Sequence, residues 1–341
     1  MSYQTHILSI GSALPGPPID NATLCKSIGV QPEWIDLYVG TRTRYFGVDI
    51  ESGRQTHSLA DMAASAASQA MSRADITPAE IGFLVLSTAT PDHLMPTSAN
   101  LVADALGLDR IPTFQVQSGC SGAIAAFELG GRLLDESRPI GLVIGADTCT
   151  KHLRLDRDVI SAMSPSELIN LVLFGDGAGA AVLSISQDGA QFGVTALINR
   201  FCGLGREPGQ QIDWFGLADR HLDQPGVNED YKAIERWVPR LSRDVLTELI
   251  ADAGIARCDL DYLLPPQLSG HMTERVVKQM EPAEHSLEIS VVADTGNNGN
   301  ALPFLQLDAL ATKARSGQLA AVVTIESSKW IEGGMVLESV T

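Results

Sequence analysis

Basic residues are scarce in this chain of 341 residues. It has 24 lysines and arginines against 41 aspartates and glutamates, which gives a formal net charge of −17. A surface of that sign repels phosphate groups, which argues against non-specific binding to nucleic acid or to an anionic membrane. No run approaches the ~18 uncharged apolar residues of a membrane span, and the N-terminus lacks a basic region followed by a long apolar one. These shortages favour a cytoplasmic protein.

Cysteine is also sparse, and the five present are widely separated: Cys25, Cys120, Cys149, Cys202 and Cys258. They include no CxxC pair and form no cluster with histidine at zinc-binding spacing. An odd and scattered set predicts free thiols rather than a disulfide framework. It also predicts that the chain has no structural metal site.

Two stretches of the chain follow the same order of predicted elements. In the first, helix 59–74, strand 81–90, helix 96–108 and strand 113–117 lead to a glycine-rich turn, which helix 123–136 and strand 141–147 follow. In the second, helix 241–255, segment 261–267, helix 270–280 and strand 288–294 lead to a Gly/Asn-rich turn, which helix 302–317 and strand 319–327 follow. Alternating strands and helices predict mostly parallel sheets that are covered on both faces. We therefore expect an α/β protein of two similar halves, 1–186 and 187–341, whose glycine-rich turns meet at the junction.

The first of these turns, QSGCSGA at 117–123, has the features of a nucleophile site. Glycines on both sides of Cys120 permit a sharp corner between a strand and a helix. Unpaired amides at a helix N-terminus stabilise a thiolate and lower the pKa of a thiol placed there. We expect Cys120 to be a nucleophile, and the alternative is a small buried core residue. The other four cysteines lack this setting and are expected to be packing residues.

Five motifs give the chain a resemblance to a known family: EWI at 33–35, TRTR at 41–44, STATPDHLMP at 87–96, QSGCSGA at 117–123 and FGDGAGAAVL at 174–183. On these residues, and along nearly its whole length, the chain resembles the thiolase-fold β-ketoacyl-acyl-carrier-protein synthase III family. The resemblance implies a thiolase-like five-layered αβαβα fold of two duplicated halves, a homodimer, and acylation of Cys120 from a coenzyme A or carrier-protein thioester. It implies no cofactor beyond phosphopantetheine or coenzyme A as the handle of the substrate.

The chain departs from the condensing members of this family at one catalytic position. In those members a histidine follows the proline at the end of the strand that corresponds to 261–265, and here Pro266 takes its place. The family's asparagine corresponds to Asn297, with Asn298 as the alternative. Histidine and asparagine together stabilise the enolate that forms when a malonyl thioester loses carbon dioxide, and removing one such donor costs about 10²- to 10³-fold in rate. Decarboxylative condensation is therefore disfavoured.

A second departure lies near the C-terminus, where the family has glycines whose backbone N–H completes an oxyanion hole. Here Ser327 and Ser328 take those positions. Because serine keeps its backbone amide, we expect the hole to persist at Ser328 in a narrower and more polar pocket; the alternative is a solvated loop. His93 lies in a loop that shapes the pocket in the family, and we expect it there rather than as the base.

Two groups of residues are expected to bind the acyl donor. The first shares one face of the helix after Pro266, which in the family holds phosphopantetheine or the carrier, and consists of His271, Arg275 and Lys278. The second is expected to contact the nucleotide or phosphates of coenzyme A, and consists of Trp34, Arg42 and Arg44. The alternative for these basic residues is a solvated charged face.

These departures favour an acyltransferase of the branch that this family has in antibiotic and polyketide biosynthesis. Such an enzyme keeps the nucleophile and alters its two partners. We expect it to load an acyl group onto Cys120 and to pass it to a carrier thiol, a hydroxyl or an amine without decarboxylation. The alternatives are a ketoacyl synthase III condensing enzyme with an unusual base and a non-catalytic subunit of an acyl-transfer complex.

Overall fold

The computed structural model describes the chain except residues 1–4, 30, 154–159, 161–162, 164 and 213–226. Its strands are β1 (His6–Ala13), β2 (Ile19–Asp20), β3 (Thr43–Arg44), β4 (Leu84–Ser87), β5 (Thr113–Val116), β6 (Ile140–Thr148), β7 (Asp176–Ser184), β8 (Phe192–Phe201), β9 (Gln210–Ile212), β10 (Val227–Glu229), β11 (Leu260–Leu264), β12 (Leu287–Glu288), β13 (Leu319–Glu326) and β14 (Ile331–Ser339). Its α-helices are α1 (Asn21–Ile28), α2 (Pro32–Tyr38), α3 (Leu59–Arg73), α4 (Ser98–Ala105), α5 (Gly122–Leu133), α7 (Pro165–Leu173), α8 (Tyr231–Ala253), α9 (Gly270–Met280), α10 (Val292–Thr295) and α11 (Leu302–Ala311).

The main sheet consists of two halves with the same strand order. One half runs β5-β4-β6-β7-β1 and the other β12-β11-β13-β14-β8. In each half the first three strands are parallel and the last two join antiparallel. The halves meet where β1 pairs with β8, through His6 with Gly193 and Ile7 with Phe192. This repetition confirms the predicted thiolase-like α/β fold of two duplicated halves. The predicted boundary between residues 186 and 187 falls in the connection from β7 to β8.

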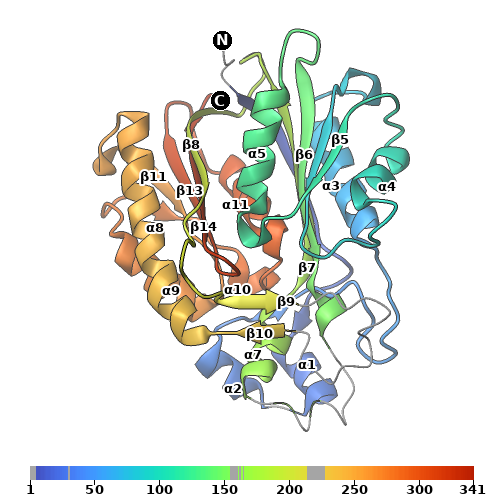
Figure 1. The fold of residues 1–341 in the computed structure, drawn as a ribbon, viewed down its shortest axis with the longest axis vertical. Helices are drawn as coiled ribbons and strands as arrows, with labels where there is room; N and C mark the ends of the chain where they lie inside the picture. The colour runs from blue at the N-terminus through green and yellow to red at the C-terminus, as the bar shows by residue number, and fades with distance from the viewer. Residues whose placement is uncertain (1–4, 30, 154–159, 161–162, 164, 213–226) are drawn as a thin grey trace.

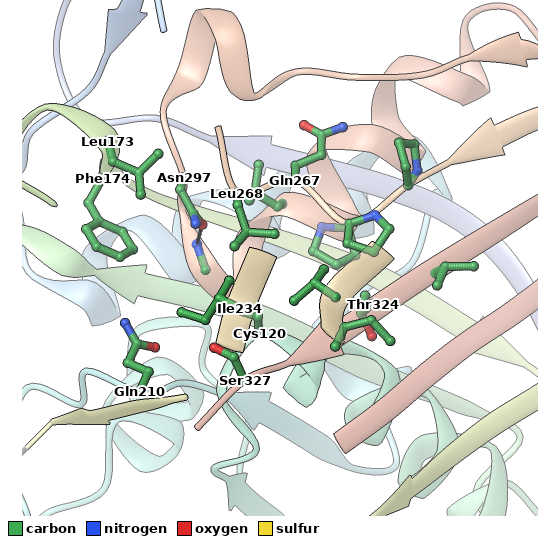
Figure 2. Close-up of a pocket in the computed structure, with 18 of the residues that line it drawn as sticks. Cys120, Leu173, Phe174, Gln210, Ile234, Gln267, Leu268, Asn297, Thr324 and Ser327 are labelled. Carbon is green, nitrogen blue, oxygen red and sulfur yellow. Dashed lines mark hydrogen bonds between the residues drawn. The ribbon is translucent and has the colours of Figure 1, made fainter. Parts of the chain in front are cut away.

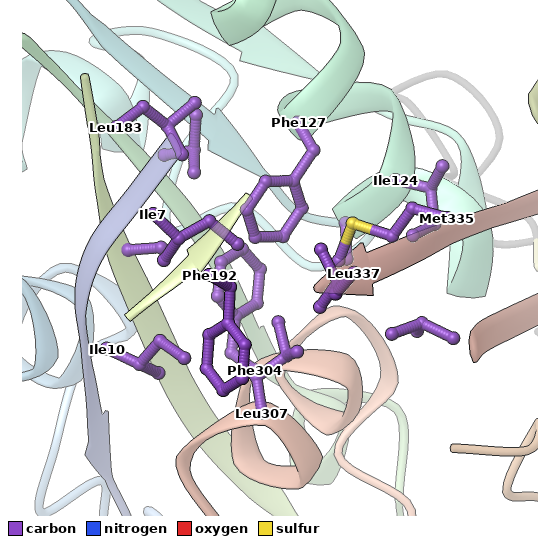
Figure 3. Packing of buried hydrophobic residues seen from close by; sticks show 14 of the residues in the cluster. Ile7, Ile10, Ile124, Phe127, Leu183, Phe192, Phe304, Leu307, Met335 and Leu337 are labelled. Atoms are coloured by element: carbon purple, nitrogen blue, oxygen red, sulfur yellow. The ribbon is translucent and has the colours of Figure 1, made fainter. Parts of the chain in front are cut away.

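Helices cover both faces of each half-sheet and give the five layers (Figure 1). Helix α3 packs its alanine-rich face on the first half, and α8 and α9 pack on the second. Helices α5 and α11 lie between the two half-sheets, where Phe127 stacks on Phe304 with ring centroids 5.1 Å apart (Figure 3). Each fully buried side chain of this size stabilises the fold by roughly 1.5–3 kcal/mol. The two glycine-rich turns precede α5 and α11, so this central layer fixes their relative position.

Several predicted elements have other bounds in the structure, and two of them differ most. The strand predicted at 288–294 is wrong, because the strand ends at Glu288 and helix α10 begins at Val292. The buried side chain of Gln267 causes the change: its Oε1 accepts the amides of Val291 at 2.9 Å and Val292 at 2.7 Å. The helix predicted at 241–255 begins earlier, at Tyr231, where the side chain of Asp230 caps it.

Candidate active site

The two glycine-rich turns line one pocket between the halves of the protein (Figure 2). Cys120 lies on its wall in the short 3₁₀ turn Gly119–Ser121, directly before α5. Gly119 has a φ of +49°, a left-handed conformation that glycine adopts without strain. The rest of the wall is largely apolar and includes Leu173, Phe174, Ile234, Val238, Pro265, Leu268, Leu302, Pro303, Val323 and Ile325. The sharp corner predicted around Cys120 is therefore present, and Cys120 faces a cavity suited to an acyl chain.

The expectation that the helix N-terminus lowers the pKa of Cys120 is wrong. Burial raises the pKa of this thiol well above its usual range, and the carboxylates of Glu326 and Asp147 raise it further. Glu326 lies 206 positions from Cys120 and Asp147 lies in β6, after α5, so the local pattern around Cys120 gives no sign of either carboxylate. A thiol with a raised pKa is neutral at pH 7, so any reaction of Cys120 as a nucleophile needs a proton acceptor.

Glu326 is one residue of the site that the sequence pattern did not reveal. It is the last residue of β13 and is only 2% exposed. Its Oε2 accepts the backbone N–H of Cys120, and its Oε1 accepts that of Ser328 at 2.6 Å. The Ser328 amide, expected to face a substrate oxygen, is thus held by a carboxylate. The sequence feature that could have indicated Glu326 is a glutamate at the end of an otherwise apolar strand, LAAVVTIE.

Of the two neighbouring asparagines in the asparagine turn, Asn297 and Asn298, only one faces the pocket. Asn297 lines the pocket with Cys120, and its Oδ1 accepts the amide of Gly299 at 3.0 Å (Figure 2). Asn298 is turned the other way, because its Nδ2 donates to the carbonyl oxygens of Asp176 at 2.8 Å and Thr295 at 3.2 Å. The amide side chain that lines the pocket with Cys120 is therefore that of Asn297.

Pro266 lines the pocket where the resemblance places a histidine. Its ring offers neither a donor nor a titratable group. The next residue, Gln267, also lines the pocket, but its amide is occupied by the backbone of Ile289, Val291 and Val292. His93 is exposed on the loop after β4 and does not line the pocket of the described residues, so its predicted place there is wrong.

Asp147 connects the two halves behind Cys120. It is 2% exposed at the end of β6, and its Oδ1 accepts from Thr88 Oγ1 at 3.0 Å, the amide of Ala89 at 2.8 Å and Thr90 Oγ1 at 2.9 Å. Its Oδ2 accepts the backbone and side-chain N–H groups of Asn300, both at 2.8 Å. Asn300 belongs to the asparagine turn, so one carboxylate holds that turn against the first half.

A polar cluster, which the sequence analysis also missed, occupies part of the pocket wall: Gln210, Glu229 and Tyr231. Glu229 accepts from Gln210 Nε2 at 2.5 Å and from Asn170 Nδ2 at 2.8 Å, and Tyr231 Oη donates to Asn170 Oδ1 at 2.6 Å. Burial and the charge of Glu229 raise the pKa of Tyr231 above its usual range. The pocket thus combines an apolar wall with a patch of hydrogen-bonding groups.

Arg44 does not lie at a surface where a ligand could reach it, contrary to the prediction. It is fully buried and donates to Asn21 Oδ1 at 2.7 Å and to the carbonyl of Val172 at 3.1 Å. Burial lowers the pKa of its guanidinium to about 10. Its role is to hold β3 against the segments around it.

The other predicted binding residues lie at the surface. Arg42 is two-thirds exposed and forms a bidentate ion pair with Asp294. Trp34 lies on α2, and the ring of His271 on α9 donates from Nε2 to the carbonyl of Asp36 on α2 at 2.9 Å.

The exposed basic residues of α9 complete this surface. Arg275 pairs with Glu235 of α8 at 3.2 Å, and Lys278 is exposed one turn further along α9. Helices α2 and α9 therefore bring Trp34 and the basic face of α9 onto neighbouring surfaces.

Comparisons of the sequence and the fold with known proteins agree with one another. Residues 114–199 match the family model described as 3-oxoacyl-[acyl-carrier-protein (ACP)] synthase III. A β-ketoacyl-[acyl-carrier-protein] synthase III of Rhizorhabdus wittichii is 30% identical over 317 residues, 92% of this chain and 91% of the relative, and one of Streptomyces coelicolor is 30% identical over 321 residues, 90% and 89%. A solved structure titled "AbyA1 - tetronic acid condensing enzyme" is 47% identical with a TM-score of 0.94, over 98% of this chain and all of that one.

A more distant structure shows the same fold. The synthase III of Pseudomonas aeruginosa is 23% identical with a TM-score of 0.83 over 99% of each chain.

Within the part of the chain that the structure describes, no helix has both the length and the apolar character needed to cross a membrane.

Proposed function

Because the chain belongs to the β-ketoacyl-[acyl-carrier-protein] synthase III family of acyl-transferring and condensing enzymes, we propose that it loads an acyl group from a carrier-protein or coenzyme A thioester onto Cys120 and passes it to a second nucleophile without decarboxylation. The observation that carries this proposal is that Pro266 lines the pocket, at the position where the resemblance to the family implies a histidine. Phosphopantetheine or coenzyme A is the handle of the substrate, and no further cofactor takes part.

The absence of that histidine limits the kind of acceptor. A malonyl group becomes a carbon nucleophile by losing carbon dioxide, and the enolate that forms needs donors that Pro266 does not supply. An acceptor must instead lose a proton. Thiols, hydroxyls and amines meet this condition, and so does a carbon between two carbonyl groups, whose C–H is acidic. The last case is a condensation, so this chain can form a carbon–carbon bond without decarboxylation.

The relative at 47% identity favours that last case. That protein is named a tetronic acid condensing enzyme, and tetronic acid is a five-membered lactone. Closing such a ring from a β-ketoacyl thioester and a hydroxyacyl thioester forms one carbon–carbon bond and one ester bond, and releases two thiols and no carbon dioxide. We propose this pair of acyl transfers for the present chain, in secondary-metabolite biosynthesis. The cluster of Gln210, Glu229 and Tyr231 supports it, because a hydroxylated acyl unit needs hydrogen-bonding groups in the pocket.

The experiment separates acyl transfer from decarboxylation. The protein is acylated with a thioester panel, and the mass increase is mapped to Cys120. The acylated protein then receives either a malonyl or a β-ketoacyl thioester carrying a carbon label. We expect the β-ketoacyl thioester to discharge Cys120 and the malonyl thioester to release no labelled carbon dioxide. Efficient, Cys120-dependent ketoester formation from the malonyl thioester contradicts the proposal.

A further inference from the structure

Glu326 is a buried carboxylate beside Cys120, and none of the ion pairs found among the described residues includes it. Its two oxygens are held by the backbone amides of Cys120 and Ser328. Carboxylates are rarely buried unless a cation or several donors compensate their charge. A buried carboxylate at a reactive residue in a pocket is therefore a sign of function.

The fold directs this carboxylate at the turn that carries Cys120. Side chains alternate along β13, so Thr324 and Glu326 point to the same face. Thr324 Oγ1 donates to Ser121 Oγ at 3.1 Å, which places that face against the turn. A β-carbon built on Gly119 would lie 1.9 Å from Glu326 Oε2, so nothing separates the carboxylate from the backbone of the turn. The charge of Glu326 and its hydrogen bonding also raise the pKa of the Cys120 thiol.

We propose that Glu326 is the proton acceptor and donor of Cys120, a role that rests on the acyl transfer proposed above. When Cys120 Sγ attacks the donor thioester, the new S–C bond forms and the thiol proton passes to Glu326. The old C–S bond breaks, and the leaving thiolate takes that proton. In the second transfer Glu326 takes the proton of the acceptor, the acyl group leaves Cys120 for the acceptor, and the Cys120 thiolate recovers the proton.

Protonation also changes what Glu326 does to the two amides. Hydrogen bonds to a carboxylate are roughly twice as strong as those to a neutral acceptor. Once Glu326 has taken the thiol proton, its hold on the amides of Cys120 and Ser328 weakens. These amides then become available to the substrate carbonyl oxygen at the moment that oxygen gains negative charge. Glu326 thus occupies the oxyanion position in the resting enzyme and leaves it during the reaction.

Glu326→Gln tests the proposal with two reactions at Cys120, each followed by mass spectrometry of the Cys120 peptide. Iodoacetamide reacts with the thiolate and needs no proton transfer to a leaving group. The acetyl thioester of N-acetylcysteamine needs a proton acceptor and donor. We expect the variant to alkylate faster at pH 7, with its pH profile shifted to lower pH, because the neighbouring charge is gone. We expect its acetylation to be slower by about 10²- to 10⁴-fold, the range for loss of a general base.

The control is Glu338→Gln, which removes an exposed glutamate from β14 of the same hairpin and should change neither rate. If alkylation and acetylation of Cys120 are both faster in Glu326→Gln, the carboxylate only blocks the site. If neither rate changes, the carboxylate only holds the turn. Either result overturns the proposal. If the unmodified protein is not acetylated at Cys120, the proposed function is contradicted. The alkylation profile then still decides whether Glu326 acts on the thiol, since an unshifted profile excludes it as a proton partner.

Discussion

Gly119 and Glu326 are in contact across the two halves of the protein, through the backbone of one and the carboxylate of the other. No side chain fits between them, since a β-carbon on Gly119 would lie 1.9 Å from Glu326 Oε2. Gly119 also has a φ of +49°, which costs other residues about 1–2 kcal/mol. The site therefore requires a glycine here for two separate reasons, strain and space.

Gly119→Ala should consequently lower the free energy of unfolding by more than the backbone strain of a left-handed alanine alone. The substitution should also slow acylation of Cys120. Gly189→Ala is the matched control, because Gly189 has a φ of +73° with no atom within 4 Å of the added carbon. Urea denaturation measures both variants. The excess loss in Gly119→Ala should be partly restored when Glu326→Ala is added. Equal losses in the two single variants would show that the carboxylate is not in the way.

The reactivity of Cys120 should depend on pH in a defined direction. Burial and the carboxylates of Glu326 and Asp147 raise the pKa of its thiol, so the thiolate is scarce at neutral pH and increases only above the usual thiol range. Alkylation of the Cys120 peptide by iodoacetamide should be slow at pH 7 and still be rising at pH 9 and above. The exposed Cys258 is an internal reference for reagent access. A rate at Cys120 that has levelled off by pH 8 is the opposite result.

Arg44→Met should destabilise the protein without affecting the binding of coenzyme A. The change leaves the buried acceptors Asn21 Oδ1 and the carbonyl of Val172 without their donor. Each unsatisfied buried group costs about 1–3 kcal/mol. Urea denaturation measures the loss, and calorimetry with coenzyme A measures binding. Arg42→Met is the comparison, because it removes an exposed guanidinium and should hardly change stability. Weakened binding with unchanged stability in Arg44→Met would restore the role predicted from the sequence.

Charge reversal on α9 should slow acylation from a carrier protein. Arg275 and Lys278 are exposed on the same helix, and the chain as a whole is strongly acidic. The double variant Arg275→Glu, Lys278→Glu should reduce the acylation rate from an acyl-carrier protein and remove its dependence on salt. Acylation by a small thioester without a carrier is the control and should be unchanged. Equal rates with carrier-bound substrate would place the docking surface elsewhere.

The sequence was sufficient for the fold, because its repeated order of elements and its family motifs both indicate two duplicated halves. It also identified the turn of Cys120 and the asparagine turn, since glycine and asparagine mark sharp corners locally. It failed where the decisive contact joins distant segments. The pKa of Cys120 depends on Glu326, 206 positions away, and the burial of Arg44 depends on partners from α1 and α7. Gln267 shows the same limit, because its side chain ends a strand that the pattern at 288–294 predicts.

The contacts of Asp147 set a condition on how this protein can change over evolution. One carboxylate fixes the distance between the loop after β4 and the turn that carries Asn297, because it binds Thr88 and Thr90 of one half and Asn300 of the other. An insertion or deletion in either segment shifts one set of these partners relative to the other. The lengths of the loop and the turn are therefore expected to vary together among relatives, although the two segments lie far apart in the sequence, whereas the apolar pocket wall is free to vary with the acyl chain.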